Sequence, residues 1–172
     1  MKPPRPCRPQ LLLAALLVAI ASPASAKAVC KTAGAHYRMI DWPGFTARFI
    51  PIGKRPGWKS DVALEVGSRQ SGRRYWFLFD GGTARYVNMI STTDVQGAGW
   101  APPPPDGGDR PLREMHYMAT NAGLRFDIDM PAAAQPAPTY ILLPDLSEVL
   151  HYGQRGGPID DAPTAFFKLE GC

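Results

Sequence analysis

Apolar residues at every second position, in short runs separated by turn residues, are the feature that most restricts the fold of this 172-residue chain. The stretch Asp61–Val66 alternates in this way, and because strand side chains point alternately to opposite faces, it predicts a half-buried β-strand. Tyr75–Phe79 is apolar on both faces, which is typical of a central strand, and Arg85–Ser91 returns after a glycine-rich turn. We therefore expect an antiparallel meander over Asp61–Ser91.

Strand patterns continue through the rest of the chain. They are found at Thr46–Gly53, Glu114–Thr120, Leu124–Met130, Tyr140–Leu143 and Ala165–Cys172. Within Leu124–Met130 apolar residues alternate with charged ones, so this segment predicts one apolar and one solvated face. The fold class expected from these patterns is all-β: a single-domain antiparallel barrel or sandwich of about 8–9 strands, built from consecutive hairpins, with little helix.

Residues 144–153 allow two interpretations. In the first, Asp145 caps a short helix that carries Leu146, Val149 and Leu150 on one face. In the second, the proline-containing start is a turn and the rest is a returning strand. We expect the hairpin, because the neighbouring segments are strands.

Two proline-rich segments interrupt the strand pattern, Gly99–Pro111 and Pro131–Pro138. Proline donates no hydrogen bond to a sheet, so neither segment is expected to be a central strand. Recognition of a polyproline helix by a partner is one interpretation. We expect instead that both segments are extended connections that cross the end of the sheet.

The N-terminus has the three-part layout of a secretory signal peptide. Lys2, Arg5 and Arg8 precede the apolar run Leu11–Ala21, and small residues end the segment at Ala26. The apolar run is shorter than the ~20 residues that span a membrane. The sequence therefore predicts a cleaved signal peptide at 1–26, a mature domain at 27–172 without a transmembrane segment, and a periplasmic or secreted location in a bacterium.

Cleavage would leave two of the three cysteines, because Cys7 lies within the signal segment. Cys30 and Cys172 then stand at opposite ends of the mature chain, and paired cysteines are usual in an oxidising compartment. We expect a disulfide that joins the two ends and stabilises the fold. No Cys-x-x-Cys pair indicates a redox role.

The charge of the mature chain is nearly balanced. Removal of 1–26 lowers Lys plus Arg from 19 to 16 and leaves Asp plus Glu at 15, a formal net charge of +1. Nucleic acid is therefore not an expected partner. The balance is +7 over Lys27–Arg85 and −6 over Tyr86–Cys172. A charged binding face is one interpretation, but we expect the two halves to interleave and their charges to pair on the surface.

Catalytic and metal-binding motifs are not found in the sequence. His36, His116 and His151 lack zinc-ligand spacing, so no metal and no cofactor is expected. There is no Gly-x-Ser-x-Gly elbow and no phosphate-binding glycine motif. Asp127 and Asp129 share one face of a predicted strand, where they form either a catalytic carboxylate pair or part of a solvated face. We expect the solvated face, and a protein that is not an enzyme.

The most distinctive segment is a Ser-Gly turn followed by two arginines and the most apolar strand. It reads Ser71, Gly72, Arg73, Arg74 and Tyr75. Arginines beside aromatic residues suit recognition of anionic or planar partners. Ser71, Gly72 and Tyr75 resemble the short Ser-Gly-x-x-Tyr loop of periplasmic inhibitors of C-type lysozyme. That resemblance covers under a tenth of the mature chain, and it implies a small exported β-barrel, a disulfide near the ends and a loop that enters the lysozyme cleft.

Three functions follow from these observations. The first is a non-catalytic binding or structural β domain of the bacterial envelope, with an envelope protein or a cell-wall component as its partner. The second is an inhibitor of a cell-wall hydrolase that uses Ser71–Tyr75. The third is a small hydrolase of envelope polymers. A closed core favours a protein-binding or structural role, whereas a lined cavity favours a small ligand.

Overall fold

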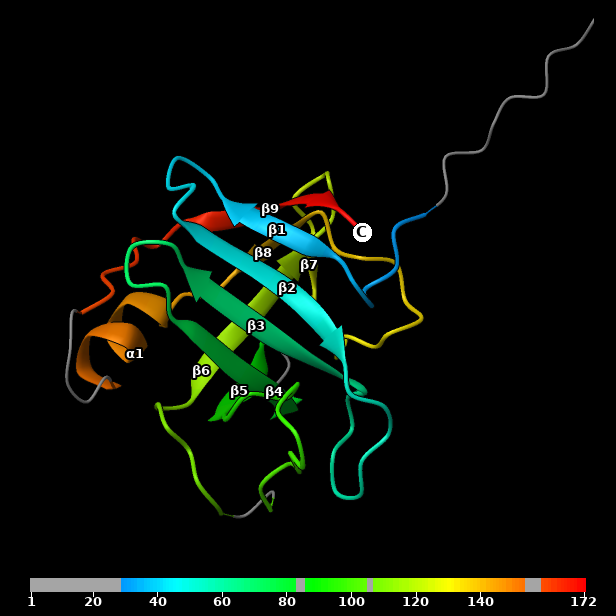
Figure 1. Cartoon of the computed structure of the whole chain (residues 1–172). Helices are drawn as coiled ribbons and strands as arrows, with labels where there is room; N and C mark the ends of the chain where they lie inside the picture. The colour runs from blue at the N-terminus through cyan, green and yellow to red at the C-terminus, as the bar shows by residue number, and fades with distance from the viewer. Residues whose placement is uncertain (1–28, 83–85, 105–106, 154–158) are drawn as a thin grey trace, which may run out of the picture.

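The computed structural model describes residues 29–82, 86–104, 107–153 and 159–172 as a nearly all-β protein. Eight strands close into an antiparallel barrel, and one further short strand extends the sheet. The strands are β1 (His36–Met39), β2 (Phe45–Pro51), β3 (Val62–Ser68), β4 (Arg74–Gly82), β5 (Val87–Thr92), β6 (Met115–Thr120), β7 (Phe126–Asp127), β8 (Tyr140–Leu142) and β9 (Phe166–Gly171). The predicted fold class is thus confirmed, and the architecture is a barrel (Figure 1).

Consecutive hairpins build most of the barrel. Neighbouring strands from β1 to β5 pair in chain order, as the alternating patterns predict. The sheet then continues from β1 through β9 and β8 to β6, and β6 closes it by pairing with β5. The expected meander over Asp61–Ser91 is therefore the β3–β4–β5 part of the barrel. The strand β1 has no counterpart among the predicted strands.

Aromatic side chains fill the interior of the barrel. Tyr37, Phe49, Phe79 and Tyr117 are each at most 1% exposed. Their rings meet in stacked and edge-on pairs, with centroids 5.1 Å apart for Phe79 and Tyr117 and 6.2 Å apart for Phe49 and Tyr117. Close-packed aromatic side chains dominate the energetics of a core, and here they occupy the space in which larger barrels hold a ligand.

A second, smaller apolar cluster covers the outside of β3, β4 and β5. Trp58, Leu78 and Ile90 are buried there, and Trp100 packs against them from the proline-rich segment Gly99–Pro111. The indole nitrogen of Trp58 donates to the carbonyl oxygen of Pro103, 3.2 Å away. Trp100 and Pro103 of the proline-rich segment therefore pack on the outside of the barrel, and this explains why the strand that begins near Tyr75 is apolar on both faces.

The expected hairpin at 144–153 is wrong, because α1 (Leu146–Gly153) occupies this segment. Leu146, Val149 and Leu150 are buried in the main core at most 2% exposed, so the helical spacing of these residues decides the local structure. The helix follows β8 and lies at the end of the barrel away from the C-terminus (Figure 1).

The expected strand at 124–130 is also largely wrong. Only Phe126–Asp127 pairs, and Leu124, Phe126 and Ile128 are 61%, 48% and 53% exposed instead of packing in the core. Barrel closure explains this outcome, since β5 and β8 already pair with β6 and only its last two residues leave room for β7.

The predicted disulfide between Cys30 and Cys172 is present, with Cα atoms 5.8 Å apart. It joins the segment before β1 to the end of β9, so Cys30 and Cys172 lie at the same end of the barrel. We call this end the disulfide end, and the opposite end, which carries α1 and the β3–β4 connection, the hairpin end. The predicted signal peptide at 1–26 lies outside the described residues.

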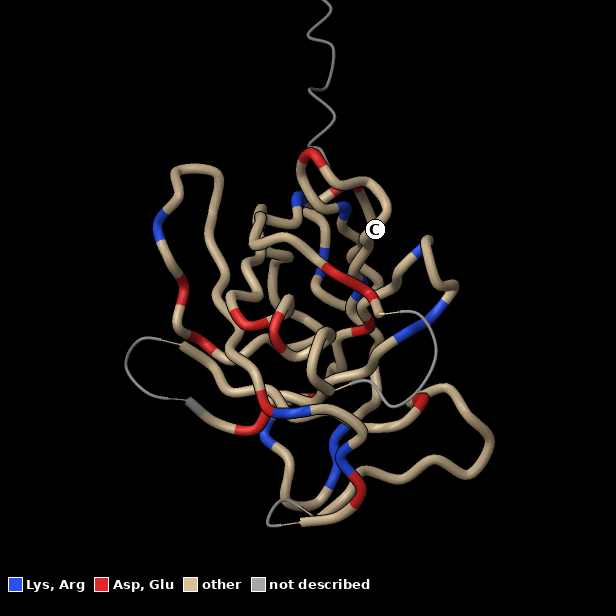
Figure 2. Tube along the Cα trace, turned by 90° about the vertical axis from the view of Figure 1, so that its left-hand side faces the viewer, with Lys and Arg blue, Asp and Glu red and all other residues tan. Residues whose placement is uncertain are grey.

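Charged residues of both signs are interspersed around the described trace, as expected (Figure 2). Arg38 in the basic half of the chain pairs with Glu170 in the acidic half, with Nε and Oε1 2.7 Å apart. No helix within the described part of the chain has the length and apolar composition that a membrane crossing needs.

Candidate functional site

The predicted binding residues form one hairpin at the hairpin end of the barrel. Ser68 ends β3, Arg74 begins β4, and the backbone N–H of Ser68 donates to the carbonyl oxygen of Arg73, 2.9 Å away. Gly72 has a φ of 72°, a left-handed conformation that glycine adopts without strain. Gly72 and Arg74 are exposed, whereas Tyr75 is only 8% exposed.

A buried carboxylate holds this hairpin in place. Asp160 is fully buried and accepts three hydroxyl hydrogen bonds, from Ser68 at 2.5 Å, Ser71 at 2.6 Å and Tyr75 at 2.5 Å. The hydroxyl of Ser71 also accepts the backbone N–H of Arg73, 3.1 Å away. We call the Asp160 carboxylate with its three hydroxyl donors the Asp160 latch. It couples the β3–β4 connection to the segment that precedes β9.

Electrostatics keep the latch in one protonation state near neutral pH. Burial acts to raise the pKa of Asp160, but the hydrogen bonds from Ser68, Ser71 and Tyr75 and the charge of Arg73 outweigh it and lower the pKa from its usual range. Burial first, and then the hydrogen bond to Asp160, raise the pKa of Tyr75 to about 12. Asp160 is therefore ionised and Tyr75 is a neutral donor under physiological conditions.

The outward side of the hairpin is basic. The Arg74 side chain is 60% exposed, and its nearest acidic partner is Glu65, with Nε and Oε1 3.9 Å apart. A groove of about 610 Å³ runs beside the hairpin, between β4 at Arg73–Trp76 and the segment Asp109–Leu112. The hairpin can therefore place guanidinium groups both at its tip and along an open groove.

Exposed apolar residues flank the hairpin. The backbone N–H of Arg69 donates to the carbonyl oxygen of Gly44 at 2.8 Å, which ties the hairpin to the turn between β1 and β2. That turn exposes Trp42 at 54%, and Ile159, next to Asp160 in the chain, is 49% exposed. Trp and Arg are the residue types that most often dominate protein interfaces. We call the exposed residues Arg69, Gly72, Arg74, Trp42 and Ile159 the hairpin surface.

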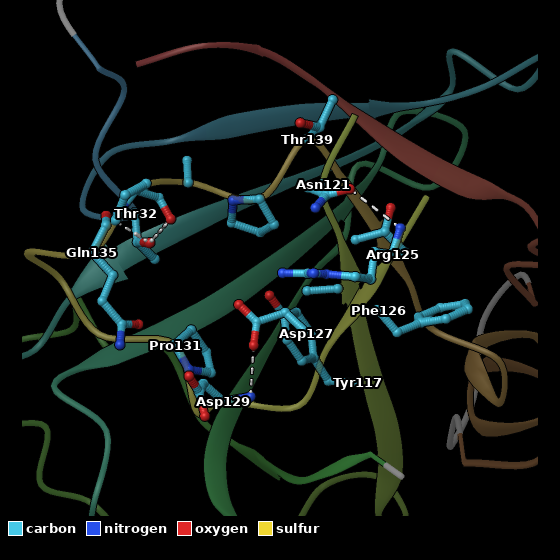
Figure 3. A pocket seen from close by; sticks show the side chains of 15 residues that line it. Thr32, Tyr117, Asn121, Arg125, Phe126, Asp127, Asp129, Pro131, Gln135 and Thr139 are labelled. Carbon is cyan, nitrogen blue, oxygen red and sulfur yellow. Dashed lines mark hydrogen bonds between the residues drawn. The ribbon is translucent and has the colours of Figure 1, made fainter. Parts of the chain in front are cut away.

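Asp127 and Asp129 lie at the opposite, disulfide end of the barrel. Both residues are exposed, and one carboxylate oxygen of Asp127 accepts the backbone N–H of Asp129 at 2.9 Å. They line a cavity of about 370 Å³ together with Arg125 (Figure 3). Glycoside hydrolases hold their two carboxyl groups on either side of the scissile bond, whereas these two carboxylates are solvent-exposed and lie in one turn.

The three histidines lie on β1, β6 and α1. His116 contacts the carboxylate of Asp145 through Nδ1 at 2.8 Å, and its ring lies 4.0 Å from the ring of Tyr86. Within the described ranges, no three His, Cys, Asp or Glu side chains are grouped closely enough to hold a metal ion.

Ser68 and Asp160 are functional residues that were not predicted from the sequence. Asp160 lies 85 residues from Tyr75 in a segment without a recognisable pattern. The hydroxyl residues at 68, 71 and 75 were the available signal, because three hydroxyls around one tight turn need a common acceptor when they are buried.

Comparisons with protein-family models, curated proteins and solved structures found no match to this chain. The chemistry of the site is therefore inferred from its geometry.

Proposed function

We propose that this protein is an exported, non-catalytic binding domain of the bacterial cell envelope, and that its hairpin surface inhibits a cell-wall hydrolase of the lysozyme type. The observation that carries the proposal is the Asp160 latch, which fixes an arginine-bearing hairpin at one end of a filled barrel. A filled interior supports binding by the outer surface rather than by a small-ligand cavity inside the barrel.

The latch favours a binding role because it orders the hairpin before any partner arrives. Immobilising a flexible side chain on binding costs about 0.5–1.5 kcal/mol, and a loop that is already rigid avoids much of that cost. Burying a carboxylate is itself unfavourable unless its hydrogen bonds are satisfied. A short connection between two paired strands does not need such a group, so its presence supports selection for a fixed hairpin.

The basic charge of the hairpin favours an acidic cleft as its target. Most glycoside hydrolases carry a pair of Asp or Glu residues on either side of the scissile bond. Guanidinium groups bind carboxylates in a fork geometry, so the exposed Arg74 suits such a pair. Trp42, at the adjacent turn, would add apolar contact at the rim of the cleft.

The resemblance to periplasmic lysozyme inhibitors supports the same target. Ser71, Gly72 and Tyr75 match their Ser-Gly-x-x-Tyr loop, and a barrel with a disulfide near its ends is what the resemblance implies. Two groups of residues can be distinguished within this loop. The hydroxyls of Ser71 and Tyr75 bind Asp160, whereas Gly72 and Arg74 are exposed, and the half-buried Arg73 interacts with Tyr75 and Asp160.

Export supports the proposed location. The disulfide between Cys30 and Cys172 is typical of proteins that fold in an oxidising compartment. Together with the predicted signal peptide, it favours the periplasm or secretion.

An inhibition assay tests the proposal. The mature protein, residues 27–172, is titrated into a C-type lysozyme that degrades labelled peptidoglycan. We expect inhibition that raises the apparent KM without changing kcat, because the hairpin would occupy the substrate cleft. An unchanged rate at a large molar excess would refute inhibition of this enzyme class.

A further inference from the structure

The cavity at the disulfide end is a second candidate site, distant from the hairpin surface. It lies between the connection from β6 to Asp129 on one side and the segment Pro131–Thr139 on the other, with a volume of about 370 Å³ (Figure 3). Small-molecule sites have volumes of roughly 300–1,000 Å³, so this cavity falls within that range.

Three buried hydroxyl residues, Thr32, Tyr117 and Thr120, line the cavity, and the hydroxyl of Thr32 donates to the carbonyl oxygen of Gln135 at 3.2 Å. Tyr117 is 1% exposed, and its ring is fixed in the core by Phe49 and Phe79. No described residue forms a hydrogen bond with the Tyr117 hydroxyl. Thr120 is also 1% exposed, and its Oγ1 is buried without a hydrogen-bond partner among the described residues. Buried hydroxyl groups are normally paired, so the Tyr117 hydroxyl calls for a partner that the described residues do not supply.

Side-chain amides and charges complete the lining. The carbonyl oxygens of Asn121 and Gln135 accept backbone N–H groups, at 2.9 Å from Gly123 and at 3.0 Å from Ala132, so their amide NH₂ groups remain available as donors. Arg125 reaches across the mouth of the cavity above Asp127 (Figure 3). The structure shows no ion pair between Arg125 and either of the neighbouring aspartates.

This set of groups favours an uncharged ligand rich in hydroxyl groups. The charged residues of the lining are Arg125, Asp127 and Asp129, and the rest of the lining, which includes Tyr117, is neutral. The resulting −1 balance disfavours an anion. Each hydroxyl of a sugar both donates and accepts, so a sugar can use carboxylates, amides and hydroxyls together.

Proline side chains supply the apolar part of the lining. Pro131, Pro136 and Pro138 all line the cavity. Their ring methylenes can pack against the C–H face of a pyranose, while the ring of Phe126 points away from the cavity (Figure 3). From this combination, we propose that the cavity at the disulfide end binds a saccharide unit. The proposal does not depend on the function of the hairpin surface, which lies at the other end of the barrel.

Binding is measured by saturation-transfer NMR and calorimetry on the mature protein with three probes: cellobiose, diacetylchitobiose and the zwitterion glycylglycine. We expect saturable binding of at least one disaccharide and none of glycylglycine. If neither disaccharide binds, or if glycylglycine binds more tightly than both, the saccharide proposal is wrong.

Two substitutions test whether the disaccharide binds in the cavity. Tyr117→Phe keeps the packed ring and removes the hydroxyl, and it should weaken disaccharide binding by roughly fivefold, the effect of losing one hydrogen bond. Asp127→Asn keeps the oxygen that accepts the Asp129 N–H and removes the charge, and it should also weaken binding.

Tyr152→Phe and Asp161→Asn make the same chemical changes at exposed positions of the hairpin end and serve as matched controls. Thermal unfolding confirms that each variant is folded, and if Tyr117→Phe is not, Asp127→Asn decides the outcome. Unchanged affinity in the folded cavity variants would place binding elsewhere and overturn the proposal.

Discussion

The hydroxyl of Tyr75 lies 2.5 Å from the carboxylate of Asp160, although 85 positions separate the two residues in the chain. This contact, with those from Ser68 and Ser71, ties the beginning of β4 to the segment before β9. The hairpin that carries the arginines is therefore part of the rigid barrel rather than a free loop, and this rigidity has measurable consequences.

Asp160→Asn should destabilise the protein. The asparagine amide keeps one acceptor oxygen but opposes hydroxyl donors with its NH₂ group, so at least one buried donor loses its partner. We expect the free energy of unfolding in urea to fall by about 2–4 kcal/mol. The control is Asp161→Asn, an exposed neighbour, which should change it by less than about 0.5 kcal/mol. Equal stabilities of the two variants would mean that the latch contributes little.

The latch should also make stability depend on pH. The folded-state pKa of Asp160 is lowered, so its contribution is present above the unfolded-state pKa of about 3.9 and is lost as pH falls through the folded value. Urea unfolding at a series of pH values should show a constant difference in the free energy of unfolding between wild type and Asp160→Asn near neutral pH. The difference should disappear in acid. A difference that persists at the lowest pH would contradict ionisation of Asp160 as its source.

Most of the strands were predictable because their signal is local. Alternation in the β3 segment and the apolar run in β4 depend only on neighbouring residues, and both strands formed where expected. The hairpin prediction for residues 144–153 was wrong. It followed the flanking strands, whereas the helical spacing of Leu146, Val149 and Leu150 determines the structure. The strand predicted at Leu124–Met130 is mostly absent for a non-local reason. In the closed barrel, β6 already pairs with β5 and β8, so little of its edge is free for a further strand.

The candidate site was predictable only in part. The Ser71–Tyr75 segment could be singled out from its glycine, arginines and tyrosine. Its acceptor could not, because Asp160 joins the hairpin through the pairing of β9 with β1 and β8, which no local pattern encodes. The cavity at the disulfide end depends in the same way on Pro131–Thr139 lying opposite β6 and β7.

The disulfide should contribute stability without affecting binding. Cys172→Ser removes a cross-link that spans 142 residues. We expect the free energy of unfolding to fall by about 2–5 kcal/mol. The double variant Cys30→Ser/Cys172→Ser should be no less stable than Cys172→Ser alone. Thiol titration of the denatured, unreduced wild type should find no free thiol in the mature chain, and two reactive thiols per chain would contradict the account.

Export should remove the predicted signal peptide. The intact mass of protein recovered from the periplasm or the medium should correspond to a chain that begins at or near Lys27, after the small residues that end at Ala26. A mass that retains Met1–Ala26 would refute cleavage.

Affinity for a C-type lysozyme, compared between two charge reversals, tests the hairpin surface most directly. Arg74→Glu reverses an exposed charge on the hairpin, and Lys54→Glu reverses an exposed charge in the β2–β3 connection at the disulfide end. Arg74→Glu places a second carboxylate near Glu65 and should lower the unfolding temperature, so thermal unfolding is used to confirm that both variants are folded at the assay temperature. We expect Arg74→Glu to raise Kd at least ~10-fold, because a carboxylate would then face the acidic cleft, and Lys54→Glu to leave Kd unchanged. Equal affinities of the wild type and Arg74→Glu, or no binding by the wild type, would contradict the proposed function.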